Sequence, residues 1–436
     1  MSGASAAEYV AIPYNGATNG SLPLAFTGSG IQAANGPPNP NLVPTGNPRL
    51  LMDGTGLTAF SDIGSSTDDA MAMASSHLAF QNKLRNGLPS LASRIRRSQA
   101  FVTTTSSGQA RSIWYPAGSK TVANRAQSAQ DRASLSITSG VPVVGDFMIL
   151  DGATTCNATP SLRTGIVRSI SQHAIIVADT ANPAGGFTAA QYDSIGLEFD
   201  SVAYAVDTAN FGGPTDLDAN GRVVIFYTRA VNELSPSPTT FATGFFANKD
   251  LFAGDSIEGC LTSNEGEMIY MMVPDPTGVV NSNVRSVSFV RNQSGPTLVH
   301  NLEHLIGASR RMYVNGASQF EDLWLDEGLA NVALELAFYR TSFGLLPRQN
   351  IGLAELTEGP NAAKRISAFN SYENTPFTYL RSWLARPDTT GALLHASRSD
   401  LTATGSVAPI GALWAFLRYA SDRVNNSDAA FWYSLV

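Results

Sequence analysis

The sequence predicts an α+β protein in which a mixed β-sheet comes first and helices follow. Runs of β-branched residues bounded by Gly, Asp and Asn recur between residues 141 and 230, as is typical of strands. After residue 295 the apolar residues recur at intervals of three and four, as is typical of helices. We therefore expect a β-like segment and a Pro/Gly/Asn-rich linker at 1–48, an α/β subdomain at 49–290, and a helical subdomain at 291–436.

Each predicted element follows from a local pattern. Two β-like runs lie within residues 8–32, and a helical pattern starts near Ser66 and continues to Arg97. Five later runs predict strands: VPVVGDFMIL, TGIVRSIS, HAIIVAD, RVVIFYT and MIYMMVPDP. One helix, TAAQYDSIGLEFDSVAYAV, interrupts these strands. Three more helices are predicted from TLVHNLEHLIGASRRMYV, FEDLWLDEGLANVALELAFYR and PIGALWAFLRYASDRV.

Composition limits the kinds of partner. The chain has 436 residues, 43% of them hydrophobic, which is enough for sizeable cores. Only 14% are charged, the net charge is −7 and no basic run occurs, so we expect no nucleic-acid partner. No stretch reaches the ~18 apolar residues of a membrane span. The oligomeric state is not indicated.

The location of the protein is predicted from composition rather than from a signal. Ser, Thr, Asn, Gly and Ala replace charged residues, which suits a secreted protein or a bacterial cell surface. The opening MSGASAAEYVAIPY lacks the basic region and apolar core of a signal peptide. The closing DAAFWYSLV stops within a predicted helix. We therefore expect a piece of a longer protein, truncated at its C-terminus.

The two cysteines, Cys156 and Cys260, leave two possibilities open. In a secreted protein so distant a pair can form a disulfide. The alternative is two unrelated buried thiols, since spacing alone does not decide the pairing.

Three residues form a candidate metal site. His300 and His304 lie four apart in a predicted helix, within about 40° of each other on one face, so both rings can bind one zinc ion. Glu327, in the next helix, is placed to be a third ligand, which leaves a fourth position for water. The alternatives are an accidental histidine pair and a solvated Glu near a helix N-terminus. Together the three residues favour zinc.

These motifs resemble a known family. HNLEH followed by WLDEGLA resembles the gluzincin zinc metallopeptidases, and the segments PTDLDANGRVVIFYT, SNEGEMIYMMVPDP and LWAFLRYASDR are similar to those of its hyicolysin-like secreted group. The resemblance covers roughly residues 140–425. It implies a zincin-like fold, zinc ligands at His300, His304 and Glu327, and hydrolysis of protein or peptide substrates through a zinc-activated water.

One position departs from the family pattern. The family's general base follows the first histidine, and here that residue is Asn301, whose amide is not basic. Losing this base is expected to cost about 10² to 10⁴ in rate. Glu303 lies on the opposite flank and is either a residue that supports the ligands, which we favour, or a substitute base. The sequence therefore predicts a zinc metalloendopeptidase with impaired catalysis, and the alternative is an inactive zinc-binding surface or interaction module.

Two weaker patterns stay open. Asp216, Asp218 and Asn220 resemble the start of a calcium loop, although a tight turn explains them as well. The family also needs a donor to the oxyanion, often a Tyr after the third ligand. Both Tyr372 and Tyr379 lie in a suitable region, and spacing does not choose between them.

Overall fold

The fold is known here from a computed structural model, which describes part of the chain. The structure describes residues 80–91, 102–104, 113–115, 135–137, 141–235, 242–254, 259–349, 351–385, 408–424 and 427–436. Two compact units divide the chain, residues 1–55 and 56–436, and the described residues all belong to the second. The β-like runs and linker expected within 1–48 lie outside the described residues. The boundaries proposed at 48 and 290 stay a prediction.

Within the described residues, nine strands form one mixed sheet in the order β3-β1-β2-β4-β5-β6-β7-β9-β8. Their bounds are β1 Val102–Thr104, β2 Ile113–Tyr115, β3 Leu135–Ile137, β4 Phe147–Asp151, β5 Leu162–Ile170, β6 Ala174–Asp179, β7 Val223–Tyr227, β8 Gly244–Phe246 and β9 Met268–Met271. The pairs β2–β4, β6–β7 and β7–β9 are parallel, and the other pairs are antiparallel. A mixed sheet followed by helices is what the sequence predicted.

The central strands are buried on both faces, which explains their unbroken apolar sequences. Every residue of β6, β7 and β9 is buried. Alternate side chains enter two cores: Ile176, Ile225 and Met271 face one, and Val177 and Phe226 face the other. A strand buried on both faces has no polar face to alternate with, so its sequence is continuously apolar.

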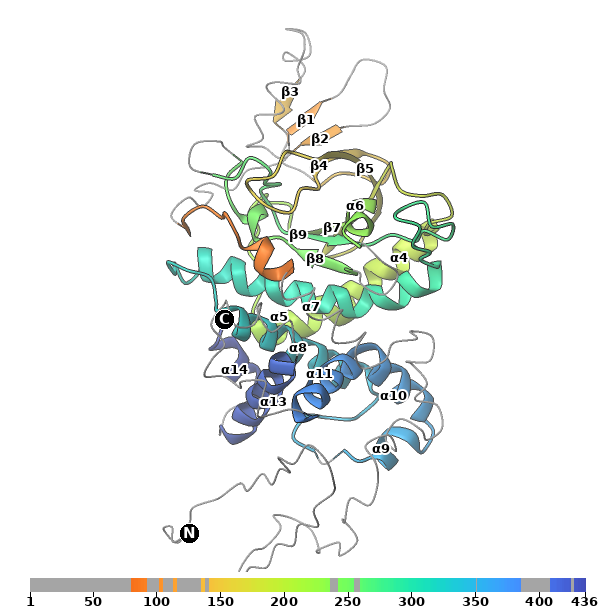
Figure 1. Cartoon of the computed structure of the whole chain (residues 1–436), viewed down its shortest axis with the longest axis vertical. Helices are drawn as coiled ribbons and strands as arrows, with labels where there is room; N and C mark the ends of the chain where they lie inside the picture. Colours follow the sequence, from red (N-terminus) through yellow and green to blue (C-terminus); the bar gives the residue numbers. More distant parts are fainter. Residues whose placement is uncertain are drawn as a thin grey trace, which may run out of the picture. The chain divides into compact units, whose positions relative to one another are not determined.

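Most helices cover one face of the sheet or form the C-terminal part, whereas α6 adds Val231 to the core on the other face. Their bounds are α4 Ala189–Glu198, η3 Phe199–Tyr204, α5 Ala205–Phe211, α6 Arg229–Glu233, η4 Asn248–Leu251, α7 Val287–Tyr313, α8 Leu323–Thr341, α9 Leu353–Thr357, α10 Ala362–Ala368, η5 Phe369–Glu373, α11 Asn374–Ala385, α13 Ala408–Arg423 and α14 Asp428–Tyr433. In Figure 1, α7 lies directly below β8, and α8 lies beneath α7. The edge strand, α7 and α8 are therefore neighbours.

Two helical predictions differ from the structure. Helix α7 begins at Val287, ten residues before the predicted start, and runs through Pro296. Proline removes one hydrogen bond of the helix, but burial of this helix outweighs that local cost. The pattern predicted from Ser66 to Arg97 is helical at residues 80–84 and turns at 85–87. Gly87 there has φ +71°, a left-handed conformation that favours glycine.

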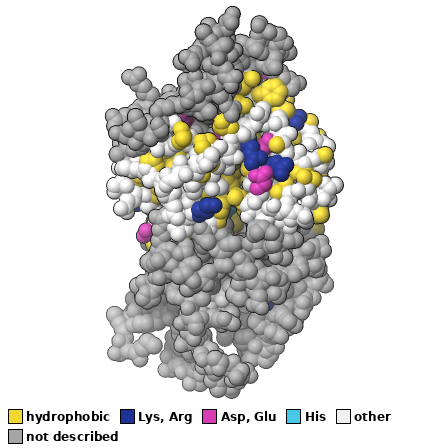
Figure 2. Space-filling view, turned by 45° about the horizontal axis from the view of Figure 1, so that its top comes forward, with side chains coloured by type: hydrophobic (Ala, Val, Ile, Leu, Met, Phe, Trp, Pro, Cys, Tyr) yellow, Lys and Arg dark blue, Asp and Glu magenta, His cyan; other side chains and the backbone are white. Residues whose placement is uncertain are grey.

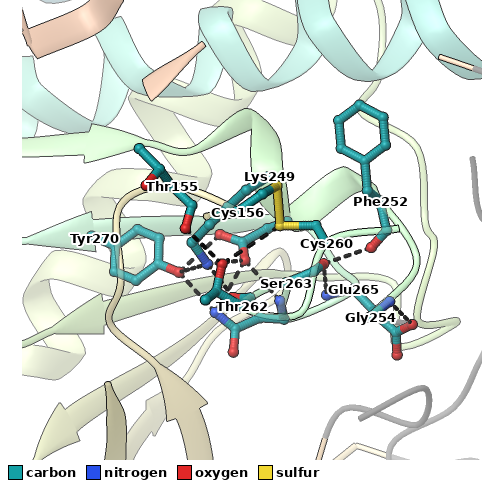
Figure 3. Close-up of a disulfide and its surroundings, with 12 residues drawn as sticks. Thr155, Cys156, Lys249, Phe252, Gly254, Cys260, Thr262, Ser263, Glu265 and Tyr270 are labelled. Carbon is teal, nitrogen blue, oxygen red and sulfur yellow. Dashed lines mark hydrogen bonds and ion pairs between the residues drawn. A yellow bond between two sulfur atoms is a disulfide. The ribbon is translucent and has the colours of Figure 1, made fainter. Parts of the chain in front are cut away.

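Cys156 and Cys260 form a disulfide (Figure 3), so the bridged alternative is confirmed. Their Cα atoms lie 4.8 Å apart, within the limit of about 7 Å for a bridge. Beside it, the Thr262 hydroxyl donates to the Thr155 carbonyl at 2.9 Å. The wholly buried Lys249 ammonium donates to the Thr262 carbonyl at 2.6 Å. The disulfide thus joins the loop after β4 to the segment before β9.

The described surface in Figure 2 matches the low charge of the sequence. Most of the coloured face is white or yellow, and a few basic and acidic side chains lie next to one another in the middle of it. None of the helices in the described part of the chain has the length and apolar character that crossing a membrane requires.

Candidate metal centre

Helices α7 and α8 bring together the three residues predicted to bind metal. The Nε2 atoms of His300 and His304 lie 3.0 Å apart, with the ring planes at 89°. Glu327 Oε2 lies 3.8 Å from His300 Nε2, and Glu327 Oε1 lies 3.8 Å from His304 Nε2. These separations fall within the range of about 3–5 Å expected for residues that share one zinc. Their role as ligands stays a prediction.

The three side chains differ in exposure. The side chain of Glu327 is 1% exposed and that of His304 is 4% exposed, whereas that of His300 is 15% exposed. Two potential ligands are thus closed in by protein, and solvent approaches from the His300 side. A metal ion held here would keep a side open to water or substrate, as catalytic sites require.

Asp326 holds the other nitrogen of His304. Its Oδ2 lies 3.0 Å from His304 Nδ1 and also contacts Nη2 of Arg85. Burial alone would lower the pKa of His304, but the charges of Asp326 and Glu327 outweigh burial and raise it. Burial would raise the pKa of Asp326, but Arg85 and His304 hold it below its ordinary value. The imidazole therefore directs Nδ1 to a carboxylate and Nε2 to Glu327.

Glu303 lies behind His304 rather than beside the potential ligand atoms. Its Oε2 is 3.8 Å from His304 Nδ1, the nitrogen that faces away from Glu327 Oε1. The side chain is 1% exposed. Burial, together with the charges of Asp326 and Asp207, raises the pKa of Glu303 well above its usual range. This position suits a support for the histidine and not a base that receives a proton from water.

Asn301 joins α7 to the edge strand. Its Oδ1 accepts the backbone N–H of Phe246 in β8 at 2.9 Å, and its Nδ2 donates to the Thr297 carbonyl at 2.8 Å. The residue is 2% exposed. Both polar ends of the amide are therefore used in binding protein.

The structure distinguishes the two tyrosines. Burial, followed by the charge of Glu327, raises the pKa of Tyr379. Tyr372 instead donates to Glu198 Oε1 at 3.3 Å, and burial followed by the charge of Glu198 raises its pKa. Tyr379 is thus the candidate on which the charge of Glu327 acts, and its role as a donor to the oxyanion stays a prediction.

The calcium-like turn collects carboxylates at another place. Single oxygens of Asp216, Asp218 and Glu267 lie within 4.8 Å of one another. Asp216 Oδ1 accepts the backbone N–H of Asn220 at 3.0 Å, and Glu267 Oε1 accepts the Thr215 hydroxyl at 2.7 Å. These hydrogen bonds explain the motif as a tight turn before β7, and calcium binding stays a prediction.

Sequence reasoning missed two residues of the site. Asp326 stands next to Glu327 in WLDEGLA, so its position in the motif was the available signal. Arg85 gave no such signal, because it lies far upstream in a pattern that predicted an ordinary amphipathic helix. Only the fold brings its guanidinium to Asp326.

Comparison with known proteins relates the chain to a metallopeptidase. No protein-family model matches the sequence. The neutral metalloprotease ShpI of Staphylococcus hyicus is 26% identical to this chain over 140 residues. The aligned part covers 32% of this chain and 29% of that protein, so it spans less than a third of either. This distant relationship stands beside a cluster of His and carboxylate groups that could hold a metal ion.

Proposed function

We propose that this chain is a zinc metalloendopeptidase of the gluzincin type, in the hyicolysin-like group, with a zincin-like arrangement of its metal-site helices. The observation that supports it best is the convergence of His300, His304 and Glu327 from two adjacent helices. The distant relationship to a neutral metalloprotease favours an enzyme over an inactive binding module.

The donor set fits zinc. Zinc–ligand bonds of about 2.0–2.1 Å at tetrahedral angles place neighbouring ligand atoms about 3.3 Å apart. The three separations in the structure, 3.0, 3.8 and 3.8 Å, lie on either side of that value. Two imidazoles and one carboxylate, with one side open, form a ligand set typical of catalytic zinc. When bound, zinc supplies a Lewis acid and activates water.

The chain's own residues support this chemistry incompletely. Asp326 fixes the ring of His304 so that Nε2 stays on the Glu327 side. Tyr379 is the proposed donor to the substrate oxygen that gains charge during hydrolysis. Asn301 has no basic atom, and Glu303 lies on the far side of His304. We therefore propose that proton transfer from the attacking water is the weak step.

The proposed substrates are peptides or proteins met outside a bacterial cell. The disulfide between Cys156 and Cys260 supports secretion or display at the cell surface, because such bonds persist in oxidising surroundings. The low proportion of charged residues, 14%, suits the same location.

Elemental analysis tests the metal assignment. The purified chain is expected to hold about one zinc ion, because the residues that the structure describes offer one His2Glu donor set of this geometry. His300→Ala removes one ligand and is expected to lose the zinc. His173→Ala is the matched control, since that ring stacks on Tyr204 at 3.8 Å and takes no part in the cluster. Equal zinc in His300→Ala and the parent contradicts the assignment.

A further inference from the structure

A short segment far upstream in the sequence packs against the metal-site helices. Within residues 80–91, Leu84 is 1% exposed in the core on one sheet face, and Leu91 is 7% exposed in the other core. The ring of Phe80 meets the ring of Phe245, beside the residue that Asn301 binds, at 5.2 Å. Residues 80–91 are therefore anchored in both cores. This anchoring fixes the direction of the Arg85 side chain, which follows Leu84 in the sequence.

Arg85 uses both terminal nitrogens of its guanidinium to contact protein groups. Nη1 donates to the Glu321 carbonyl at 2.7 Å, and Nη2 contacts Asp326 Oδ2. The side chain is 8% exposed. The same carboxylate oxygen lies 3.0 Å from Nδ1 of His304. A guanidinium, a carboxylate and an imidazole thus follow one another, and the imidazole directs its other nitrogen to Glu327.

The energetics of burial make Arg85 important to this arrangement. A carboxylate as buried as Asp326, at 5% exposure of its side chain, is strongly disfavoured unless a cation compensates its charge. Arginine does this with a rigid fork, and its second donor, on Glu321, prevents the guanidinium from turning away. A fixed Asp326 in turn fixes the ring of His304, since partners of a metal-binding histidine set its orientation.

We propose that Arg85 is a positioning residue of the metal centre: it holds Asp326, and Asp326 orients His304 toward the metal. This inference rests on the proposed function, because it takes His304 as a ligand. It makes residues 80–91 part of the metal centre, although they lie outside the HNLEH and WLDEGLA motifs.

The test measures metal affinity rather than catalysis. Zinc dissociation constants are determined by competition with a chromophoric chelator, and the absorption spectrum of the cobalt-substituted protein reports ligand geometry. Arg85→Gln keeps a donor for the Glu321 carbonyl but loses the charge, and it is expected to bind zinc about 10- to 100-fold more weakly. Arg85→Lys restores the charge and is expected to recover most of the affinity.

A neighbouring arginine provides the control for local disruption. Arg311 pairs instead with the Glu321 carboxylate at 3.0 Å and donates to the Gln319 carbonyl at 2.8 Å. Arg311→Gln is expected to bind zinc with an affinity within about twofold of that of the parent. Removing a residue that positions a metal ligand costs about tenfold or more, so the two outcomes are distinguishable. Far-UV circular dichroism and thermal melting establish that each variant is folded.

A double-variant cycle separates positioning from general stability. Asp326→Asn keeps an oxygen beside His304 Nδ1 but carries no charge, so adding Arg85→Gln to it is expected to change affinity little further. Parental affinity and an unchanged cobalt spectrum in Arg85→Gln overturn the inference. If Arg85→Gln lowers zinc affinity as much in the Asp326→Asn protein as in the parent, the inference is also overturned. If the parent itself holds no zinc through His300, the proposed function fails instead.

Discussion

Replacing Asn301 with Glu tests whether the site lacks only its base. Asn301 follows His300 on the helix that carries both histidines, and its amide binds the Phe246 N–H at 2.9 Å on the edge strand. Glutamate is one methylene longer and has a basic carboxylate, so it can accept a proton that Asn cannot. We expect kcat/KM to rise by about 10² or more and zinc affinity to change little.

The substitution has two structural costs. The bond from Asn301 Nδ2 to the Thr297 carbonyl, 2.8 Å long, is lost, and a carboxylate is placed at a position that is 2% exposed, where its charge is costly to bury. A lost hydrogen bond of this kind costs about 1 kcal/mol. A rate gain of about 10² is equivalent to roughly 2.7 kcal/mol in the activation barrier, and kcat/KM is compared on folded, zinc-loaded protein so that a loss of stability does not hide this gain.

The assay is hydrolysis of casein and of a broad peptide library, with zinc content measured on the same samples. Asn301→Gln is the matched control, because it has the length of glutamate without the basic group, and it is expected to show no gain. If Asn301→Glu holds full zinc and cleaves no faster than Asn301→Gln, the lack of a base at position 301 is not what limits the rate of hydrolysis. If neither variant nor the parent cleaves any peptide while all hold zinc, the chain is an inactive zinc-binding interaction module and not an enzyme.

Glu303→Gln provides the companion measurement. Because Glu303 faces His304 Nδ1, we expect its removal to leave the rate-limiting proton transfer unchanged. An active parent whose activity Glu303→Gln abolishes would identify Glu303 as the base and contradict this placement.

Two further predictions concern stability. The Cys156–Cys260 bond closes a loop with a separation of 104 residues, so Cys156→Ser with Cys260→Ser should cost about 2–5 kcal/mol in urea unfolding; a change below about 1 kcal/mol would contradict this. Burial, partly offset by Arg418, raises the pKa of Glu335 from 4.5 to about 7. The folded state therefore holds this proton more tightly than the unfolded state. Its contribution, on the order of 3 kcal/mol, is complete below about pH 4.5 and lost as pH rises through about 7. Thermal melts from pH 4 to 8 should show a flatter profile for Glu335→Gln, and equal slopes would disprove this.

The sequence predicted those features that depend on local periodicity. The apolar runs predicted strands β6, β7 and β9, because fully buried strands need continuous apolar sequence, and they also predicted β4 and β5, which are only partly buried. Helix α7 was recognised, but its first ten residues were not, because Pro296 looks like a helix start when only local preference is considered. The turn at 85–87 was not predicted, because the helical spacing of apolar residues continues through the residues where the chain turns. The left-handed conformation of Gly87 permits this turn.

For the site, the sequence by itself determined the donor types and their spacing. Two histidines one helical turn apart and a glutamate in the next helix are local facts, and local geometry follows from them. Only the tertiary structure decided that Glu327 lies on the Nε2 side of His304 while Glu303 lies on the Nδ1 side, that the charge of Glu327 acts on Tyr379, and that Arg85 contacts Asp326. Each of these depends on packing between segments distant in sequence. Periodicity within one segment carries no information about which distant segment packs against it.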